Sequence, residues 1–352
     1  MAAIPSAPWP STRTRSTRCK EARPMVQPWP RYQWPDGKQA AFCFTVDVDA
    51  TAPYLWVQRA PGAARTLGQL EQRHFGQRLG VWRIMDLVER FGIKGSFFVP
   101  GTIAEEHPNL LPAILERGHE VGLHGWFHEL VAESSDAEFT AALEASVELF
   151  RRQTGAAPKG FRSPAWEMTP YMVREVRRLG LWDSSLMGAD HPYEIEGLVE
   201  VPVQWAIDDA ILYKYSGLPG DRTPATPGVV LESWREEWEG QHQYGGMLML
   251  TVHDWISGRV QRLRMLEKLL AQVTATPGAW VATVGEVAAW HAASANAGRF
   301  LAEARIRSRW SRAASAGASW VKLRKRHAKF LACYGRKLLQ ARGAASASRG
   351  AS

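Results

Sequence analysis

Short apolar runs alternate along this chain with segments whose apolar residues repeat at helical spacing. From residue 40 onward the apolar runs predict strands at 41–46, 94–99, 119–123, 159–162, 199–203, 247–252 and 279–282. The segments between them predict helices at 81–92, 136–155, 169–180 and 259–273. Alternation of this kind over about 250 residues is typical of a mostly parallel α/β sheet, either closed as a (β/α) barrel or doubly wound.

Two aspartates, Asp47 and Asp49, stand at the end of the first predicted strand, in the stretch AFCFTVDVDA. Residues i and i+2 of a strand share a face, so the two carboxylates repel each other unless a cation or a shared proton lies between them. A strand end that simply meets water is the alternative. In parallel folds the reactive residues gather where strands end and loops begin, so we expect the partners of these carboxylates at other strand ends.

Two histidines follow the third predicted strand, in GHEVGLHGWFHE. His124 and His128 are four residues apart, and such a pair can present both imidazoles to one point if the segment turns helically. Two ordinary surface or loop histidines are the alternative. Because Asp49 ends the first strand and His124 the third, the fold brings three N and O ligands to one rim, with open positions for water and substrate. An open site of this kind is catalytic rather than structural.

Further polar side chains follow two more strands. GFRSPAWE places Arg162, Pro164 and Trp166 after the fourth, where a turn with a surface arginine is the alternative reading. His253 ends the apolar strand MLMLTV, where a core histidine bonded to the backbone is the alternative. Two carboxylates, three histidines and an arginine at four strand ends together indicate metal-assisted hydrolysis.

The net charge of +8 is unevenly distributed over the 352 residues. Residues 299–352 hold 14 lysines and arginines against the single acid Glu303, and residues 1–30 hold 5 against Glu21. The central region is therefore mildly acidic. We divide the chain into a disordered basic arm (1–30), a catalytic domain (31–298) and a basic C-terminal extension (299–352).

The extension combines its charge with aromatic residues, namely Trp310, Trp320, Phe330 and Tyr334. A solvated helix or disordered tail is the plainest interpretation, contact with an anionic membrane or polymer comes second, and nucleic acid is a distant third. The chain has no apolar run of about 18 residues, no apolar region after the basic N-terminus, and three cysteines without paired or metal-type spacing. These features favour a cytoplasmic protein, at most peripheral to the membrane. Met25 is an alternative start of the protein.

A long insertion, residues 54–77, follows the first strand. Its aromatic residues Tyr54, Trp56 and Phe75 favour a lid over the site or a contact within a homo-oligomer, and a mobile loop is the alternative. A lid would suit a small or short acylated substrate, whereas a polymer requires an open groove.

The order of these motifs resembles that of the polysaccharide deacetylases, also known as carbohydrate esterase family 4 or NodB-homology domains. The matching blocks are TVDVD, HGWFH, FRSPAWE, WDSSLM and LTVHDWISGRVQRLRMLEKL, within roughly residues 35–292. The resemblance implies a distorted, incomplete (β/α) barrel. The chain departs from the common family pattern at two places, with TVDVD instead of TFDDG and PAW instead of PY. Both variants make it look closer to the subgroup that contains peptidoglycan-deacetylase-like proteins, cyclic imide hydrolases and allantoinase-like ureide hydrolases.

The resemblance also implies a division of labour at the strand ends. Asp49, His124 and His128 would bind a divalent ion, with Zn²⁺ preferred among first-row metals. Asp47 would be the general base that takes a proton from water, and Arg162 would orient it and keep it ionised.

The remaining implied roles concern the leaving group and the pocket. His253 would protonate the leaving nitrogen, and Asp183, in the WDSSLM block, would orient His253. Trp166 and Pro164 would line the substrate pocket.

Three functions fit these features. The first is deacetylation of an N-acetylated sugar or a related small or oligomeric acylated substrate, and the second is hydrolysis of a cyclic imide or ureide with the same acid and base. The third is a polyanion- or membrane-binding protein in which the enzymatic domain is secondary. The three intact ligand positions count against a decayed enzyme.

Overall fold

The computed structural model describes residues 31–59, 66–217 and 220–302. The expectations for the basic arm, for the aromatic residues of the extension and for a start at Met25 lie outside these residues. No helix within the described ranges is both long enough and apolar enough to span a membrane.

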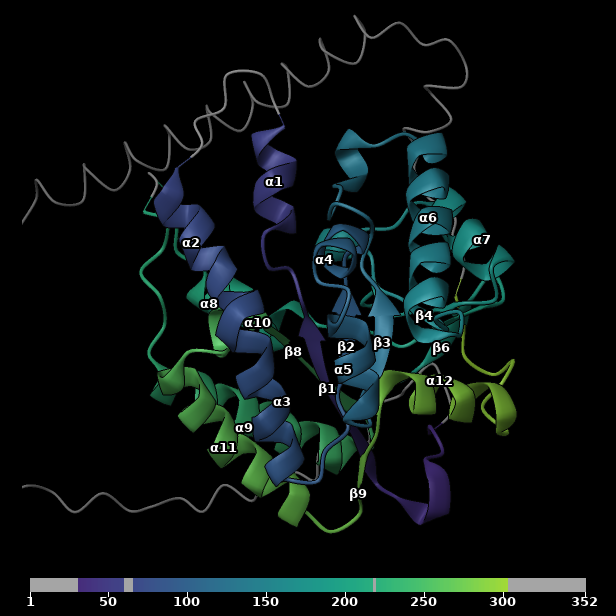
Figure 1. The fold of residues 1–352 in the computed structure, drawn as a ribbon. Helices are drawn as coiled ribbons and strands as arrows, with labels where there is room; N and C mark the ends of the chain where they lie inside the picture. The colour runs from purple at the N-terminus through teal and green to yellow at the C-terminus, as the bar shows by residue number, and fades with distance from the viewer. Residues whose placement is uncertain (1–30, 60–65, 218–219, 303–352) are drawn as a thin grey trace, which may run out of the picture.

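A single, mostly parallel sheet forms the centre of the fold (Figure 1). Its strands lie side by side in the order β10-β6-β7-β5-β4-β3-β2-β1-β8, and β9 pairs with the start of β1. Only the β6–β7 pair is antiparallel among the described pairs. The strands are β1 (Ala40–Asp47), β2 (Ser96–Val99), β3 (Glu120–Leu123), β4 (Gly160–Phe161), β5 (Trp182–Asp183), β6 (Tyr193–Ile195), β7 (Leu198–Glu200), β8 (Met247–His253), β9 (Ala279–Val281) and β10 (Leu301–Ala302).

The sheet curls until its two sides nearly meet. A parallel bridge between Asp208 and Thr251 brings the segment after β7 against β8. This bridge stands where a complete barrel would have a full strand pair. The expectation of a distorted, incomplete (β/α) barrel is confirmed.

β1 is buried along its whole length because it lies between β2 and β8 and is covered on both faces. Phe42 points outward and packs edge-on against Trp238, with ring centroids 5.9 Å apart. Thr45 and Asp47 point the other way, into the barrel, where both accept hydrogen bonds from Arg162. The period of two along the strand thus separates a hydrophobic outer face from a polar inner one.

Helices surround this sheet. All four predicted helices are present, as α3 (Val81–Arg90), α6 (Asp136–Thr154), α7 (Pro170–Arg178) and α11 (Val260–Ala275). α6 begins at a capping box formed by Ser135 and Glu138 and ends at Gly155, whose φ of 79° is left-handed. Further helices are α4 (Gly101–Glu106), α5 (Leu110–Glu116), α8 (Ala210–Tyr213), α9 (Pro227–Tyr244), α10 (Asp254–Ser257) and α12 (Val284–Ala293), with short turns η1 (Pro35–Gly37), η3 (Val131–Glu133), η4 (Pro164–Trp166) and η5 (Trp205–Ile207).

The described part of the insertion is helical. Together with the residues that flank it, it forms α1 (Ala52–Gln58), α2 (Leu67–Phe75) and the π-helical turn η2 (Gly76–Gly80), and Figure 1 shows α1 and α2 beyond the C-terminal end of β1. Two glycines allow this segment to lie against α10. A Cβ on Gly76 would come within 2.2 Å of the Asp254 carboxylate, and one on Gly80 within 2.0 Å of the Asp254 carbonyl oxygen. Only glycine permits so close a backbone approach.

Candidate metal and catalytic site

Asp47 and Asp49 lie at the C-terminal end of β1, as the sequence predicts, and both are buried, with 1% and 5% of their surface exposed. Asp47 is the register partner of His253 on β8, so these two side chains leave neighbouring strands on the same face. The strand order therefore brings the expected base and the expected acid to one rim.

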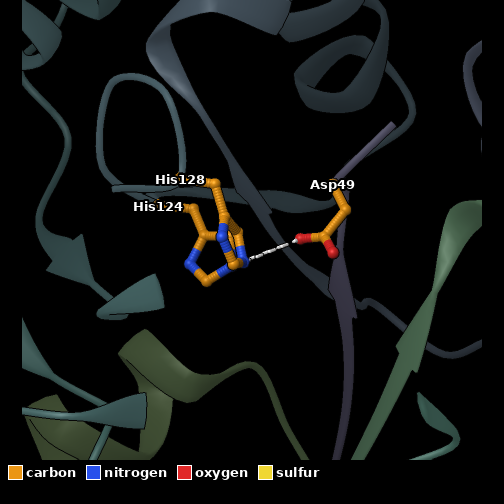
Figure 2. A group of neighbouring side chains, drawn as sticks. All are labelled: Asp49, His124 and His128. Carbon is orange, nitrogen blue, oxygen red and sulfur yellow. Dashed lines mark ion pairs between the residues drawn. The ribbon is translucent and has the colours of Figure 1, made fainter. Parts of the chain in front are cut away.

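His124 and His128 meet Asp49 (Figure 2). The Nε2 atom of each ring lies 3.5 Å from Asp49 Oδ1. His124 Nδ1 donates a hydrogen bond of 2.8 Å to the carbonyl oxygen of Arg162, so Nε2 is the ring nitrogen that faces the carboxylate. The predicted ligand set therefore converges on one point.

The two rings converge although the loop between the histidines does not form the helical turn considered from the sequence. Gly125 and His128 both have positive φ, 69° and 58°. The carboxylate of Glu129 braces the loop by accepting hydrogen bonds from the backbone N–H groups of Trp126 and Phe127. Pro164 packs against Gly125, where an added Cβ would lie 3.0 Å from its ring. Two left-handed residues thus achieve the convergence that a helix would have given.

The donor set fits a divalent cation. Asp49 Oδ1 is buried and has no hydrogen-bond partner among the described residues, since both imidazole nitrogens are too far away for a good hydrogen bond. One ligand atom from each of Asp49, His124 and His128 lies within 4.8 Å of the others. Burial lowers the pKa of His128 to about 4, so this ring keeps a free lone pair at neutral pH. Nitrogen and carboxylate ligands of this kind suit Zn²⁺ and other first-row metals.

Asp47 is held in place by Arg162 and Trp166. Arg162 Nη1 donates to Asp47 Oδ1 at 2.8 Å, as expected, and Trp166 Nε1 lies 3.3 Å from Oδ2. The guanidinium is anchored in turn by the carbonyl and hydroxyl oxygens of Ser184, each at 2.9 Å. Burial raises the pKa of Asp47, but Arg162 and the neighbouring histidines outweigh this effect and hold that pKa below its usual value. Asp47 is therefore ionised.

Trp166 reaches Asp47 through an unusual turn. Ala165 and Trp166 in η4 have φ values of 53° and 56°, which is uncommon for residues other than glycine. The indole stacks on Trp205, with ring centroids 4.4 Å apart. The two tryptophans form an aromatic wall beside the carboxylate of Asp47.

His253 is oriented by Asp209. Its Nδ1 lies 2.7 Å from Asp209 Oδ1, and its backbone N–H donates to Asp209 Oδ2 at 3.0 Å. The other ring nitrogen, Nε2, faces Asp49 Oδ2 at 3.8 Å. Burial lowers the pKa of His253, but Asp209, Asp49 and Asp208 together raise it well above the usual value.

The expectation that Asp183 orients His253 is wrong. The carboxylate of Asp183 accepts a hydrogen bond from Ser185 Oγ at 2.7 Å and lies beside Glu200, with which it forms a buried acidic pair. Burial raises the pKa of both acids of the pair. Asp209 takes the expected place because the segment after β7 reaches β8 through the Asp208–Thr251 bridge. The signal in the sequence was the acidic pair in QWAIDDA, which follows the predicted strand 199–203.

Arg73 also reaches the site, and sequence reasoning missed it. This residue belongs to α2 in the insertion, and its Nη1 lies 3.4 Å from Asp49 Oδ2. The start of the insertion also contacts η3 at the surface, because Trp56 Nε1 and Arg59 Nη2 both donate to Glu133 Oε2, at 3.1 and 2.7 Å. The insertion therefore contributes one side chain, that of Arg73, to the site.

Comparisons with known proteins give a consistent result. The profile of the polysaccharide deacetylase family matches residues 76–182. A peptidoglycan deacetylase of Helicobacter pylori is 26% identical over 285 residues, which cover 71% of this chain and 96% of that protein. A solved structure from Mycobacterium smegmatis, named as a candidate polysaccharide deacetylase, is 35% identical with a TM-score of 0.70, and the match covers 75% of this chain and 93% of that one. An allantoinase structure shares the fold, with 20% identity and a TM-score of 0.66 over 80% of this chain and 99% of that one.

Proposed function

Because this chain belongs to the polysaccharide deacetylase family and is a hydrolase of carbon–nitrogen bonds other than peptide bonds, we propose that it deacetylates an N-acetylated sugar or a related acylated substrate with the help of Zn²⁺. The observation that carries this proposal is the orphaned Asp49 Oδ1, which faces the Nε2 atoms of His124 and His128. These three residues would hold the ion. When bound, the ion would supply Lewis-acid polarisation of the scissile carbonyl group.

Asp47 is the general base in this proposal. Arg162 occupies Oδ1, so Oδ2 is the oxygen that takes a proton from the attacking water. The guanidinium keeps Asp47 ionised, which a base requires, and the indole N–H of Trp166 restrains the carboxylate from the other side. Trp166 with Trp205 would line the substrate pocket.

His253 is the general acid. Asp209 holds its Nδ1, so Nε2 carries the proton that passes to the leaving nitrogen as the carbon–nitrogen bond breaks. The negative charge of Asp209 favours the protonated ring, so the acid is charged before the reaction begins.

The direct test is acetate release from N-acetylglucosamine oligomers. We expect hydrolysis by the Zn²⁺-loaded protein, loss of hydrolysis after treatment with a chelator, and recovery when Zn²⁺ is returned. Asp47→Asn protein prepared in the same way is the control for contaminating hydrolases. Hydrolysis that survives complete removal of metal would overturn the metal-dependent mechanism.

A cyclic imide or ureide is the second candidate substrate. It is favoured by the enclosure of the site, because Asp47 and Asp49 are almost wholly buried and Arg73 of the insertion contacts Asp49. The same base and acid would serve, since both reactions attack an amide-type carbonyl. Turnover of succinimide or allantoin, with no release of acetate from acetylated sugars, would select this function over deacetylation.

A further inference from the structure

Arg73 has no role in the mechanism above, although it lies at the site. Its side chain is 12% exposed, and its guanidinium lies over the ring of Trp255, 3.9 Å from the centroid. Within the described residues its one hydrogen bond is the 3.4 Å contact from Nη1 to Asp49 Oδ2.

This contact leaves the arginine largely unsatisfied. Charge-assisted hydrogen bonds between arginine and a carboxylate are about 2.7–2.9 Å long, so the contact with Asp49 is weak. A guanidinium has five N–H donors, and in the described part of the chain only one of those of Arg73 meets a protein acceptor. The remaining donors of this 12% exposed side chain are open to water or to a ligand that supplies acceptors.

The position of Arg73 is built into the fold. The residue lies one turn before Gly76, whose lack of a Cβ lets the helix rest on Asp254. Trp255, the next residue of α10, supplies the ring under the guanidinium. The short helix that follows His253 thus provides both the surface that receives the insertion and the platform that aims its arginine at the site.

A cation on Asp49 would increase the need for an anion at Arg73. The proposed metal would take up the negative charge of Asp49, the one acceptor that Arg73 has among the described residues. We propose that Arg73 binds a carboxylate of the substrate, so that the preferred substrates are N-acyl compounds with a carboxylate next to the scissile amide. The planar guanidinium fork matches a carboxylate in two parallel hydrogen bonds. This inference rests on the proposed function, whose substrate class it narrows.

A matched pair of substrates isolates the charge. We would compare the 3-O-lactyl ether of N-acetylglucosamine with the primary amide of the same ether, using Zn²⁺-loaded protein. The wild type should prefer the carboxylate by about tenfold or more in kcat/KM. This is the usual effect of one hydrogen bond to a charged group on binding. Arg73→Gln should bring this ratio close to one, mainly through KM, and Arg73→Lys should restore part of it. Arg78→Gln is the control, because Arg78 lies in the neighbouring turn η2 but pairs with the exposed Glu71.

Binding of the two deacetylated products, measured by calorimetry, separates this inference from the proposed function. A preference for the carboxylate product that disappears in Arg73→Gln protein supports the inference even if neither substrate is hydrolysed. No preference in the wild type, or the same preference in Arg73→Gln protein, overturns it even if both substrates are hydrolysed. An equal loss on both substrates, accompanied by loss of metal, would likewise overturn it and make Arg73 a support for Asp49.

Discussion

At the scale of single residues, the two imidazoles should be indispensable for metal binding. A catalytic ion seldom stays on two protein ligands, so His124→Ala and His128→Ala proteins should lose both the metal and hydrolysis. Elemental analysis of the purified variants measures the metal directly. His74→Ala is the matched control, because His74 pairs with the exposed Glu71 away from the site. Near-stoichiometric metal in the His128→Ala protein would refute the ligand assignment.

Substitutions of the two aspartates at the end of β1 should have different effects. Asp47→Asn should keep the metal but lose turnover on the order of 10²-fold or more, because an amide of the same size cannot act as a general base. Asp49→Asn should lose metal affinity, because it removes the one carboxylate that faces both histidines. Metal content and kcat measured on the same preparations distinguish the two. The opposite pair of phenotypes would show that ligand and base are exchanged.

The pH profile should report the contact between His253 and Asp209. Burial lowers the pKa of His253 and Asp209 raises it, so the protonated acid persists to higher pH in the folded protein. Asp209→Asn removes the raising charge, and the alkaline limb of kcat/KM should therefore move to lower pH. Asp183→Asn should leave that limb in place, because Asp183 contacts Ser185 and Glu200 instead. A shift in Asp183→Asn alone would restore the assignment made from the sequence.

At the scale of elements, the docking of the insertion and η2 on α10 depends on Gly76 and Gly80, whose backbone lies against Asp254. Gly80→Ala would place a Cβ 2.0 Å from the carbonyl oxygen of Asp254, which is backbone and cannot turn aside. We expect a loss of about 1–3 kcal/mol in the free energy of unfolding, the usual cost of overpacking, measured by urea denaturation. Gly68→Ala in α2 is the control, since nothing lies within 4 Å of its added Cβ. Equal stability of the two variants would mean that the insertion is not closely docked.

At the scale of the whole molecule, the catalytic fold should not depend on the extension. The described fold continues past residue 298, because β10 pairs with β6 and Phe300 is fully buried. Deletion of 303–352 should leave metal binding and hydrolysis of small substrates intact. Deletion of 299–352 should also cost stability, because it removes Phe300 from its contact with Tyr32, at 5.2 Å between ring centroids.

The same deletion tests the membrane hypothesis. If the extension binds anionic lipid, full-length protein should bind anionic vesicles at low salt and release them as the Debye length falls to about 8 Å at physiological ionic strength. Protein without residues 303–352 should not bind the anionic vesicles. Full-length protein that ignores anionic vesicles even at low salt would leave the extension as a solvated tail. Thermal unfolding of both deletions checks that each protein is folded.

The sequence by itself determined the sheet and most of the rim. Asp47, Asp49, His124 and His253 each stand at or just beyond the end of an apolar run, and in a parallel sheet such ends meet on one side whatever the details of the loops. The local sequence pattern was therefore enough to predict that these four residues lie close together. The two- and three-residue strands β5, β6 and β10 escaped prediction, whereas the equally short β4, β7 and β9 overlap the predicted runs 159–162, 199–203 and 279–282.

Only the tertiary structure decided which neighbours complete the site. Asp183 and Asp209 look alike in the sequence, but a single bridge between Asp208 and Thr251 brings Asp209 to His253, and pairing with β7 holds Asp183 beside Glu200. Arg73 reaches Asp49 because two glycines let a distant helix rest on α10. Such contacts depend on the close packing of segments far apart in the chain, and hydrophobic periodicity records which face of an element is buried but not which partner covers it.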